Sequence, residues 1–229
     1  MSNRSIHTLL KSWDEECPLT REEAVEVLNL PEEEMDSLME CAYALRTKYK
    51  GKKVSVQLLT NVRSGNCTQN CAYCAQSKDS QAEIEKYKRV SDEKLYGDND
   101  LVDEKHLARH CIGLSGIGFS DEEIEDLADR IREMKKKDTQ ICCSIGFLTE
   151  KQARILKDAG LDRINHNLNS SRSFYPEICT THTYDQRVNN IKMLQSLGFE
   201  ICSGGIVGMG ESKDCLLYTS PSPRDTERS

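Results

Sequence analysis

The sequence has no long hydrophobic run and no excess of basic residues. None of its apolar stretches approaches the ~20 residues that a membrane-spanning helix requires, so we expect no membrane partner. The first residues are polar and lack the apolar core of a secretory signal. With 38 acidic and 31 basic residues the formal net charge is −7, which argues against a nucleic-acid partner, because nucleic acids favour a basic surface.

Cysteine, by contrast, is frequent. The 229 residues include 11 cysteines, which in a secreted chain would indicate disulfides. Without a secretory signal, the better interpretation is metal ligation in a reducing cytoplasm, and we expect a cytoplasmic protein. The odd number of cysteines is compatible with that interpretation and fits complete disulfide pairing poorly.

Three cysteines lie close together directly after an alternating apolar run at 54–62. Cys67, Cys71 and Cys74 have Cys-x3-Cys-x2-Cys spacing, which lets one loop place three thiolates around a corner of an iron–sulfur cube. Electron-transfer clusters of this kind use four cysteines, so a three-cysteine site leaves one iron open for a substrate or cofactor. The alternatives are a zinc site or buried free thiols, but a zinc site would need a fourth ligand, and none lies nearby in the sequence.

The pattern changes near residue 50. Residues 1–50 are expected to form a helical segment, in which Thr20 and Glu23 make a capping box and Pro31 opens a further helix. Cys41 is expected to be a packing residue on that helix. The expected inner face of the same helix comprises Leu38, Met39, Ala42 and Leu45.

Strand and helix patterns alternate over residues 51–214. Strands are expected at 54–62, 109–114, 140–145, 163–168 and 200–207, and helices at 120–137, 149–159 and 184–197. This alternation predicts an α/β fold with a parallel sheet, here an incomplete (β/α) barrel of the TIM type with about five strands. The active site of such a barrel lies at the carboxyl ends of its strands.

Two places break the pattern. Only the short segment Leu101–Ala108 lies between the cysteine loop and the second strand, too little for a crossover helix, so we expect about a dozen residues to be missing there. Residues 215–229 have no apolar period and resemble a translated sequencing adapter, so we expect a tail that is not native. The chain would then be a fragment that ends in the helix after its fifth strand, and we expect it to be inactive.

Three further cysteines fall on three of the expected strands. Cys111, Cys142 and Cys202 are expected to share one register, from which neighbouring parallel strands can aim their side chains at one point inside a barrel. Such a set predicts a second, deeper iron–sulfur cluster. The alternative is that these cysteines only pack the barrel interior.

Four motifs carry a resemblance to a known family. They are Gly65–Cys74, His110–Gly113, Asn165–Leu168 and Cys202–Glu211, and together they resemble those of the biotin synthases of the radical S-adenosylmethionine superfamily. The resemblance implies that Cys67, Cys71 and Cys74 bind a [4Fe–4S] cluster. It also implies that Cys111, Cys142 and Cys202 bind an auxiliary cluster, [2Fe–2S] or a variant, whose usual arginine ligand would come from a later strand that this sequence lacks.

The same resemblance implies a binding site for S-adenosylmethionine. Asn167 would contact the ribose or the substrate, and Asn169 stands where an acidic ribose ligand is usual. His182 matches a basic position near the methionyl carboxylate, and Ile206 lies in the adenine-side motif. Tyr73 is the aromatic residue that precedes the third cysteine of the loop. No side chain is assigned a catalytic role, because the cofactors supply the chemistry.

By this resemblance the reaction is the conversion of dethiobiotin to biotin through a 5′-deoxyadenosyl radical, with the auxiliary cluster as the sulfur donor. A flavodoxin or ferredoxin would supply electrons, and the full-length protein is expected to be a homodimer. The alternatives are a related radical enzyme of the methylornithine synthase or hydrogenase maturase type, a non-catalytic iron–sulfur electron carrier, and a zinc-stabilised binding protein. The second set of cysteines argues against the related enzymes.

Overall fold

The computed structural model describes residues 20–218. The expected helical residues before Thr20 and most of the expected tail lie outside this range. Residues 55–211 form one compact unit, which holds the sheet and all the residues of the site. Within residues 20–218 no helix combines the length and the apolar character that crossing a membrane requires.

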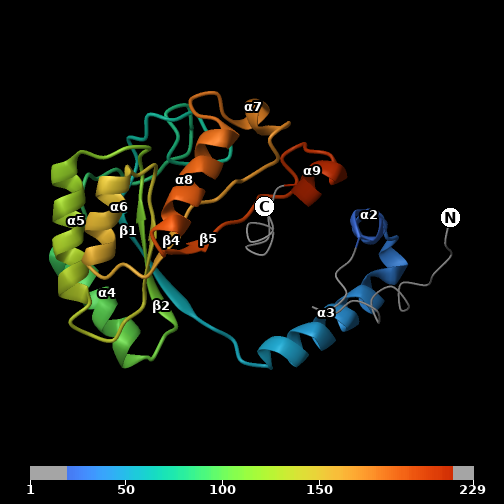
Figure 1. Cartoon of the computed structure of the whole chain (residues 1–229), viewed down its shortest axis with the longest axis horizontal. Coiled ribbons are helices and arrows are strands. Elements are labelled where there is room, and N and C mark those ends of the chain that lie inside the picture. The colour runs from blue at the N-terminus through green and yellow to red at the C-terminus, as the bar shows by residue number, and fades with distance from the viewer. Residues whose placement is uncertain (1–19, 219–229) are drawn as a thin grey trace. The chain divides into compact units, whose positions relative to one another are not determined.

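The sheet has five parallel strands in sequence order, as expected for the first part of a (β/α) barrel. The strands are β1 (Gln57–Arg63), β2 (Arg109–Leu114), β3 (Ile141–Ser144), β4 (Arg163–Asn165) and β5 (Glu200–Cys202). Helices lie between successive strands and cover one face of the sheet (Figure 1). The expected α/β class and partial barrel are therefore confirmed.

The covering helices begin at side-chain caps. They are α4 (Asp92–Glu104), α5 (Asp121–Met134), α6 (Glu150–Asp158) and α8 (Tyr184–Ser196). Their N-caps are Ser91, Ser120, Thr149 and Thr183, and each cap side chain accepts a hydrogen bond from the backbone N–H three residues on. Such a cap stabilises a helix by about 1 kcal/mol. The residue at which each of these helices begins is therefore determined by the sequence of its first turn.

Successive side chains along each strand point to opposite faces of the sheet, and the two faces differ in character. Ile112, Ile141, Cys143 and Ile164 are fully buried against the helices and form the centre of the core. Their neighbours along the strands point to the opposite face, because side chains alternate with a period of two. That face carries polar side chains and the second set of cysteines. It corresponds to the interior of the barrel.

Helix α4 corrects the expectation of missing residues. It runs from Asp92 to Glu104 and supplies a crossover helix of 13 residues between the cysteine loop and β2. Its buried side chains are Leu95, Asn99 and Val102, at positions i, i+4 and i+7. The polar Asn99 interrupts the apolar period at a buried position, which is why the sequence pattern did not reveal the helix.

The N-terminal segment contains α2 (Arg21–Leu28), a 3-10 turn (Glu32–Glu34) and α3 (Met35–Lys50). The capping box of Thr20 and Glu23 is present as expected. Neither helix has a buried residue, and Met39 on the expected inner face is 67% exposed, so the expected burial of that face is wrong. A pair of short helices offers too little apolar area to bury such a face by itself.

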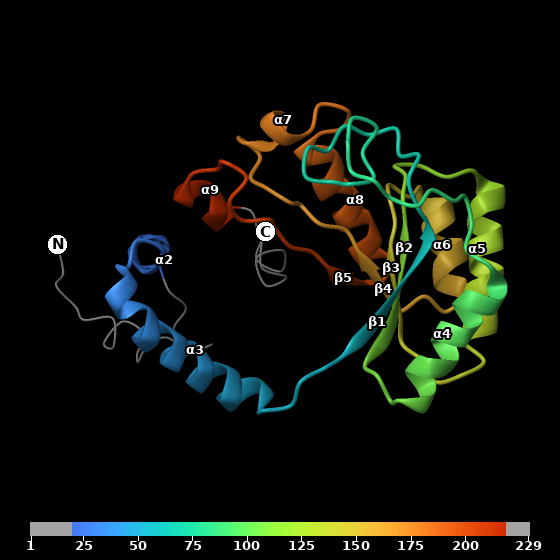
Figure 2. The same cartoon turned by 180° about the vertical axis from the view of Figure 1, so that it is seen from behind.

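Two further helices are short. The first was not expected, whereas a helix after the fifth strand was. Helix α7 (Tyr175–Ile178) follows β4, and the segment 64–90 lies at the same end of the sheet in both views (Figures 1 and 2). Helix α9 (Lys213–Tyr218) extends into the first residues of the expected tail. Its start is capped by Ser212, whose Oγ accepts a hydrogen bond from the backbone N–H of Cys215 at 3.2 Å.

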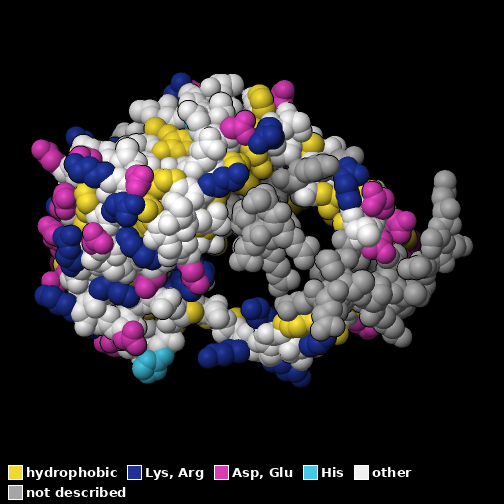
Figure 3. Space-filling model, in the orientation of Figure 1, with side chains coloured by type: hydrophobic (Ala, Val, Ile, Leu, Met, Phe, Trp, Pro, Cys, Tyr) yellow, Lys and Arg dark blue, Asp and Glu magenta, His cyan; other side chains and the backbone are white. Residues whose placement is uncertain are grey.

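The outer face of the helical layer is covered by charged side chains of both signs, which are interspersed (Figure 3). Ion pairs on this layer join Arg89 to Asp126 at 3.1 Å and Lys151 to Asp121 at 2.6 Å. Exposed pairs of this kind contribute about 0–1 kcal/mol each, so they add little to the stability of the layer.

Candidate active site

A cavity of about 330 Å³ opens at the carboxyl ends of the strands. Its walls come from the cysteine loop after β1, from the turns after β2, β3 and β4, and from α8 with the residues before it. The thiol, polar and charged side chains that line it include Cys67, Gln69, Cys71, Tyr73, Cys74, Asn167, Asn169, His182 and Arg187. This is the edge at which a (β/α) barrel builds its active site.

The cysteine loop has no regular secondary structure and is held by hydrogen bonds. The backbone N–H of Gly65 donates to Gln76 Oε1 at 2.7 Å, and the Ser115 hydroxyl donates to the Gly65 carbonyl at 2.6 Å. Gly65 has a φ of 70°, a conformation that favours glycine. The Lys78 N–H closes the loop onto the Gln69 carbonyl at 2.9 Å. These bonds fix the loop that carries all three cysteines.

Cys67, Cys71 and Cys74 all line the cavity, and none is in a disulfide. Cys71 is buried, and the other two are half-buried. Burial and the neighbouring Cys179 raise the pKa of the Cys71 thiol to about 11, so metal binding there must displace a proton. The remaining walls present amide, hydroxyl and guanidinium groups rather than further thiols. Three thiols on one side of a cavity fit a four-iron cluster with one open iron.

A different set of three groups lies close enough to hold a single metal ion. The ligand atoms of Cys71, Cys179 and His182 lie within 4.8 Å of one another, and all three residues are buried. The hydrogen bonds of His182 argue against this use. Arg187 Nη2 lies 2.9 Å from His182 Nε2, and a guanidinium can only donate, so Nε2 accepts and Nδ1 carries the hydrogen. The nitrogen that faces Cys179 is therefore not free to bind a metal.

His182 lies in the same wall, and its neighbours set its protonation. Burial and the positive charge of Arg187 lower the pKa of its imidazole to about 4, so the ring is neutral near pH 7. The cation in this wall is Arg187 on α8, which sequence reasoning missed. Its described partners are all neutral: the Tyr175 hydroxyl at 2.6 Å, the Asn167 carbonyl at 3.1 Å and His182. An arginine on a helix gives no separate signal in the sequence.

Tyr73, Asn169 and Ile206 are brought together although they are far apart in sequence. Asn169 Nδ2 donates to the Tyr73 hydroxyl at 2.6 Å, and the Asn169 carbonyl accepts from the Ile206 N–H at 2.8 Å. Asn169 has a φ of 66°, a conformation that asparagine tolerates better than most residues. Asn167 and Asn169 line the cavity, whereas Ile206 lies beside it and is 38% exposed.

The second group of cysteines lies on the same face of the sheet but not in one row. Cys111 and Cys142 are register partners, whereas Cys142 is aligned with Arg163, and Cys202 with Asn165. Cys202 is thus two residues farther along the sheet, so the expectation of one shared register is wrong for it. Because side chains alternate between the two faces of a sheet, a shift of two residues leaves Cys202 on the same face as Cys111 and Cys142.

The thiols of the register partners Cys111 and Cys142 interact with each other. The hydrogen bond from Cys142 lowers the pKa of Cys111 to about 7, with help from the positive charges of Arg109 and Arg163. The same hydrogen bond, with burial, raises the pKa of Cys142. Cys111 is therefore the more acidic thiol of the pair. The adjacent Cys143 points the other way, is fully buried in the helical core and is a packing residue.

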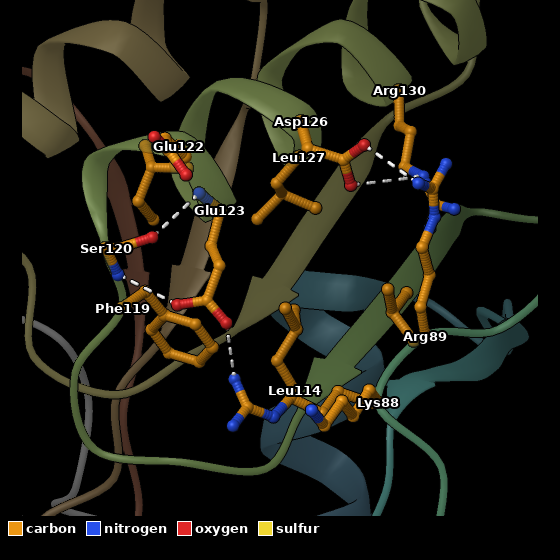
Figure 4. A pocket seen from close by; sticks show the side chains of 13 residues that line it. Lys88, Arg89, Leu114, Phe119, Ser120, Glu122, Glu123, Asp126, Leu127 and Arg130 are labelled. Atoms are coloured by element: carbon orange, nitrogen blue, oxygen red, sulfur yellow. Dashed lines mark hydrogen bonds and ion pairs between the residues drawn. The ribbon is translucent and has the colours of Figure 1, made fainter.

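A second cavity of about 270 Å³ lies on the outside of the sheet, beside α5 (Figure 4). Its apolar wall includes Leu114, Phe119 and Leu127. Several of its charged groups are paired; Glu123, for example, accepts from Arg63 Nη1 at 3.0 Å and from the Ser120 N–H at 2.8 Å. No cysteine or histidine lines this cavity, and the pairing of its charges indicates a structural role.

Comparisons with known proteins agree with this geometry. Residues 61–219 match the family model of the radical SAM superfamily. The chain is 40% identical over 207 residues to the biotin synthase of Geobacillus kaustophilus and 41% identical over 205 residues to that of Bacillus subtilis. These matches cover 90% and 89% of the chain but only 62% and 61% of those proteins, so the chain spans about 60% of the length of these relatives.

Among solved structures, methylornithine synthase superposes with a TM-score of 0.81 at 16% identity, over 94% of this chain and 63% of that one. A likeness at this identity concerns the fold alone. The family model covers the segment from the end of β1 to α9, which includes the cysteine loop and strands β2 to β5. The chain belongs to the radical SAM superfamily.

Proposed function

We propose that the protein to which this chain belongs inserts sulfur into dethiobiotin to form biotin, as a radical SAM enzyme. The observation that carries the proposal is the cavity at the carboxyl edge of the sheet. Three thiols line one side of it, and the facing wall contains no further thiol. Similarity to biotin synthases at 40% and 41% identity supports the substrate class. The second group of cysteines on the interior face supports sulfur insertion over the alternative radical enzymes.

Cys67, Cys71 and Cys74 would hold the [4Fe–4S] cluster. A cluster bound there would supply the electron for the reductive cleavage of S-adenosylmethionine to methionine and a 5′-deoxyadenosyl radical. The protein's own contribution is to orient the partners and exclude water around them. Tyr175 and Leu168, 2% and 1% exposed, pack in the same apolar cluster as Cys71 and shield that side of the loop.

The polar groups of the cavity suit S-adenosylmethionine. Arg187 carries a positive charge with neutral partners and would receive the methionyl carboxylate, with the neutral His182 orienting its guanidinium. Asn167 and Asn169 offer donors and acceptors that a ribose diol requires. Ile206, tied to Asn169 by a backbone hydrogen bond, would pack beside the adenine, and Tyr73 would fix the Asn169 amide.

Cys111, Cys142 and Cys202 would hold the auxiliary cluster, [2Fe–2S] or a variant, that donates sulfur. Their common face and the register pairing of Cys111 with Cys142 support this assignment. The positive charges of Arg109 and Arg163 lower the pKa of Cys111 and favour the thiolate that binds a metal. Dethiobiotin would then lie between the two groups of cysteines, on the interior face of the sheet.

The wider assignments follow from the same proposal. A flavodoxin or ferredoxin would donate electrons, and the full-length protein would be a cytoplasmic homodimer. We further propose that residues 1–50 form a helical segment, that 51–214 form a partial barrel, and that 215–229 are a non-native tail. This chain by itself would not form biotin, because a five-stranded sheet encloses only part of the substrate pocket.

Anaerobic reconstitution with iron and sulfide tests the proposal. The chain should bind a [4Fe–4S] cluster whose visible spectrum changes when S-adenosylmethionine is added. Cys71→Ala should abolish cluster binding and the spectral change. Cys41 is a half-buried cysteine on α3, so Cys41→Ala should alter neither cluster binding nor the spectral change. A cluster that is indifferent to S-adenosylmethionine would instead indicate an electron carrier, and a colourless zinc protein would indicate a structural metal site.

A further inference from the structure

Four side chains form a continuous hydrogen-bonded chain that ends on a cysteine of the loop. Arg187 contacts His182, His182 contacts Cys179, and Cys179 contacts Cys71. The distances are 2.9 Å from Arg187 Nη2 to His182 Nε2, 3.3 Å from His182 Nδ1 to Cys179 Sγ, and 3.8 Å between the two sulfur atoms. Cys71, Cys179 and His182 are all buried, with exposed fractions of 7%, 4% and 5%.

The chain has a defined direction at its first two steps. Arg187 can only donate, so His182 Nε2 accepts and His182 Nδ1 bears the hydrogen. That hydrogen lies between Cys179 Sγ and Gln69 Oε1, which is 2.9 Å from Nδ1. Gln69 Oε1 is the nearer acceptor, and Cys179 Sγ receives the longer contact of a shared hydrogen bond, so the S–H of Cys179 is directed to an acceptor elsewhere.

Three acceptors lie within reach of that S–H. Asn70 Oδ1, at 3.5 Å, already accepts from the N–H groups of Thr180 and Thr181 and from the Thr181 hydroxyl. Thr181 Oγ1, also at 3.5 Å, already accepts from the Asn70 N–H. The sulfur of Cys71, once it is a metal-bound thiolate, has no hydrogen and carries negative charge. A charged acceptor makes the stronger bond, so the S–H of Cys179 points to Cys71.

The backbone keeps the two cysteines in this position. The Ala72 N–H donates to the Ile178 carbonyl at 2.9 Å, which joins the residues next to each cysteine. Cys179 is therefore held beside the loop without itself lining the cavity that Cys67, Cys71 and Cys74 share.

We propose that Cys179 is a positioning residue that raises the reduction potential of the cluster bound at Cys67, Cys71 and Cys74, through an S–H hydrogen bond to Cys71. The inference rests on the proposed function. A hydrogen bond to a ligating sulfur withdraws negative charge and so stabilises the reduced, more negative cluster. Arg187 and His182 support the bond by polarising the sulfur of Cys179.

The test is a redox titration of the reconstituted cluster, followed by electron paramagnetic resonance. All proteins carry Cys142→Ala, so that the second group of cysteines is disrupted. Cys179→Ala removes the donor, Cys179→Ser keeps one, and Cys143→Ala is the matched control because Cys143 is equally buried but lies in the helical core. Iron content is measured for each protein.

Cys179→Ala should bind as much iron as the parent and lower the one-electron reduction equilibrium constant about tenfold, which corresponds to a potential more negative by ~59 mV. The reduction potential of Cys179→Ser should lie between those of the parent and Cys179→Ala, and the potential of Cys143→Ala should match that of the parent. Equal shifts for Ala and Ser, or no shift for Ala, would overturn the proposal. Loss of iron in Cys179→Ala would also overturn it, since Cys179 would then be a ligand. Failure of the parent to bind a cluster would instead contradict the proposed function.

Discussion

Asn70 and Thr180 hydrogen-bond to each other in both directions, although 110 residues separate them in the sequence. Asn70 Oδ1 accepts from the Thr180 N–H at 3.1 Å, and Asn70 Nδ2 donates to Thr180 Oγ1 at 2.7 Å. The same Oδ1 accepts from the Thr181 N–H at 3.2 Å. One side chain thus joins the cysteine loop to the segment before α8, which carries Cys179 and His182.

Replacing Asn70 should loosen this junction. Asn70→Ala removes the acceptor for two backbone N–H groups and should lower the free energy of unfolding by about 1–2 kcal/mol, since the site is partly open to solvent. Asn70→Asp keeps the acceptor and should cost less. The measurement is urea denaturation of the metal-free chain. An Asp variant as unstable as the Ala variant would contradict this account of the junction.

The local parts of the fold could be predicted from the sequence. The capping boxes at Ser120 and Thr149 depend only on residues within one helical turn, and both are present. Strand β2 has the expected bounds. The strands β4 and β5 are shorter than expected, because the backbone leaves the regular ladder beyond Asn165 and Cys202, where residues such as Asn169 adopt a left-handed conformation.

The missed features depend on contacts between distant residues. In α4 the buried Asn99 is satisfied by His110 Nδ1 at 3.2 Å and by the Met134 carbonyl at 3.2 Å, and neither partner could be known from the sequence. The positions of Arg187 and Cys179 beside the cysteine loop likewise follow from the approach of two segments more than 100 residues apart. Spacing revealed the cysteines of the loop because they are neighbours in the chain.

Two glycines should respond oppositely to alanine. At Gly146, after β3, an added Cβ would lie 2.6 Å from the carbonyl carbon of Ile117, and both residues line the cavity. Gly146→Ala should therefore destabilise the chain by about 1–3 kcal/mol and displace that wall. Gly97 lies on the exposed side of α4 with nothing within 4 Å, so Gly97→Ala should stabilise by about 0.5–1 kcal/mol. Thermal unfolding of both variants checks the signs, and a stabilising Gly146→Ala would contradict the close packing of these two turns.

The affinity for S-adenosylmethionine should depend on the planar shape of the Arg187 guanidinium as well as on its charge. Arg187→Lys keeps the charge but loses the planar fork that contacts Tyr175, Asn167 and His182, so the affinity for S-adenosylmethionine should fall about tenfold, or ~1.4 kcal/mol. Arg187→Gln should weaken binding further. Equilibrium dialysis with the reconstituted chain measures both.

Arg172 offers the control for this series. It is exposed and pairs with Asp185 at 2.7 Å, so Arg172→Lys should leave the affinity unchanged. Unaltered binding by Arg187→Gln would show that the methionyl carboxylate is held by another group.

His166 should make the stability of the chain depend on pH. The imidazole is 1% exposed and packs against Phe147 with ring centroids 5.3 Å apart. Burial and the positive charge of Arg187 lower its pKa from 6.5 to about 3. The folded state therefore holds this ring neutral, and the unfolded state takes up a proton as the pH falls below 6.5. The stability is present above pH 6.5 and is lost toward pH 3, with a slope of at most about 1.4 kcal/mol per pH unit for one histidine.

Chemical denaturation of the metal-free chain between pH 7 and pH 4 would measure this slope. His166→Gln should reduce it by about one proton, because the folded and unfolded states then no longer differ in the protonation of residue 166. The control is His106, which is exposed and has a φ of 50°; His106→Asn suits that conformation and should leave the slope unchanged. Equal slopes for the parent and His166→Gln would mean that residue 166 is not held neutral by burial.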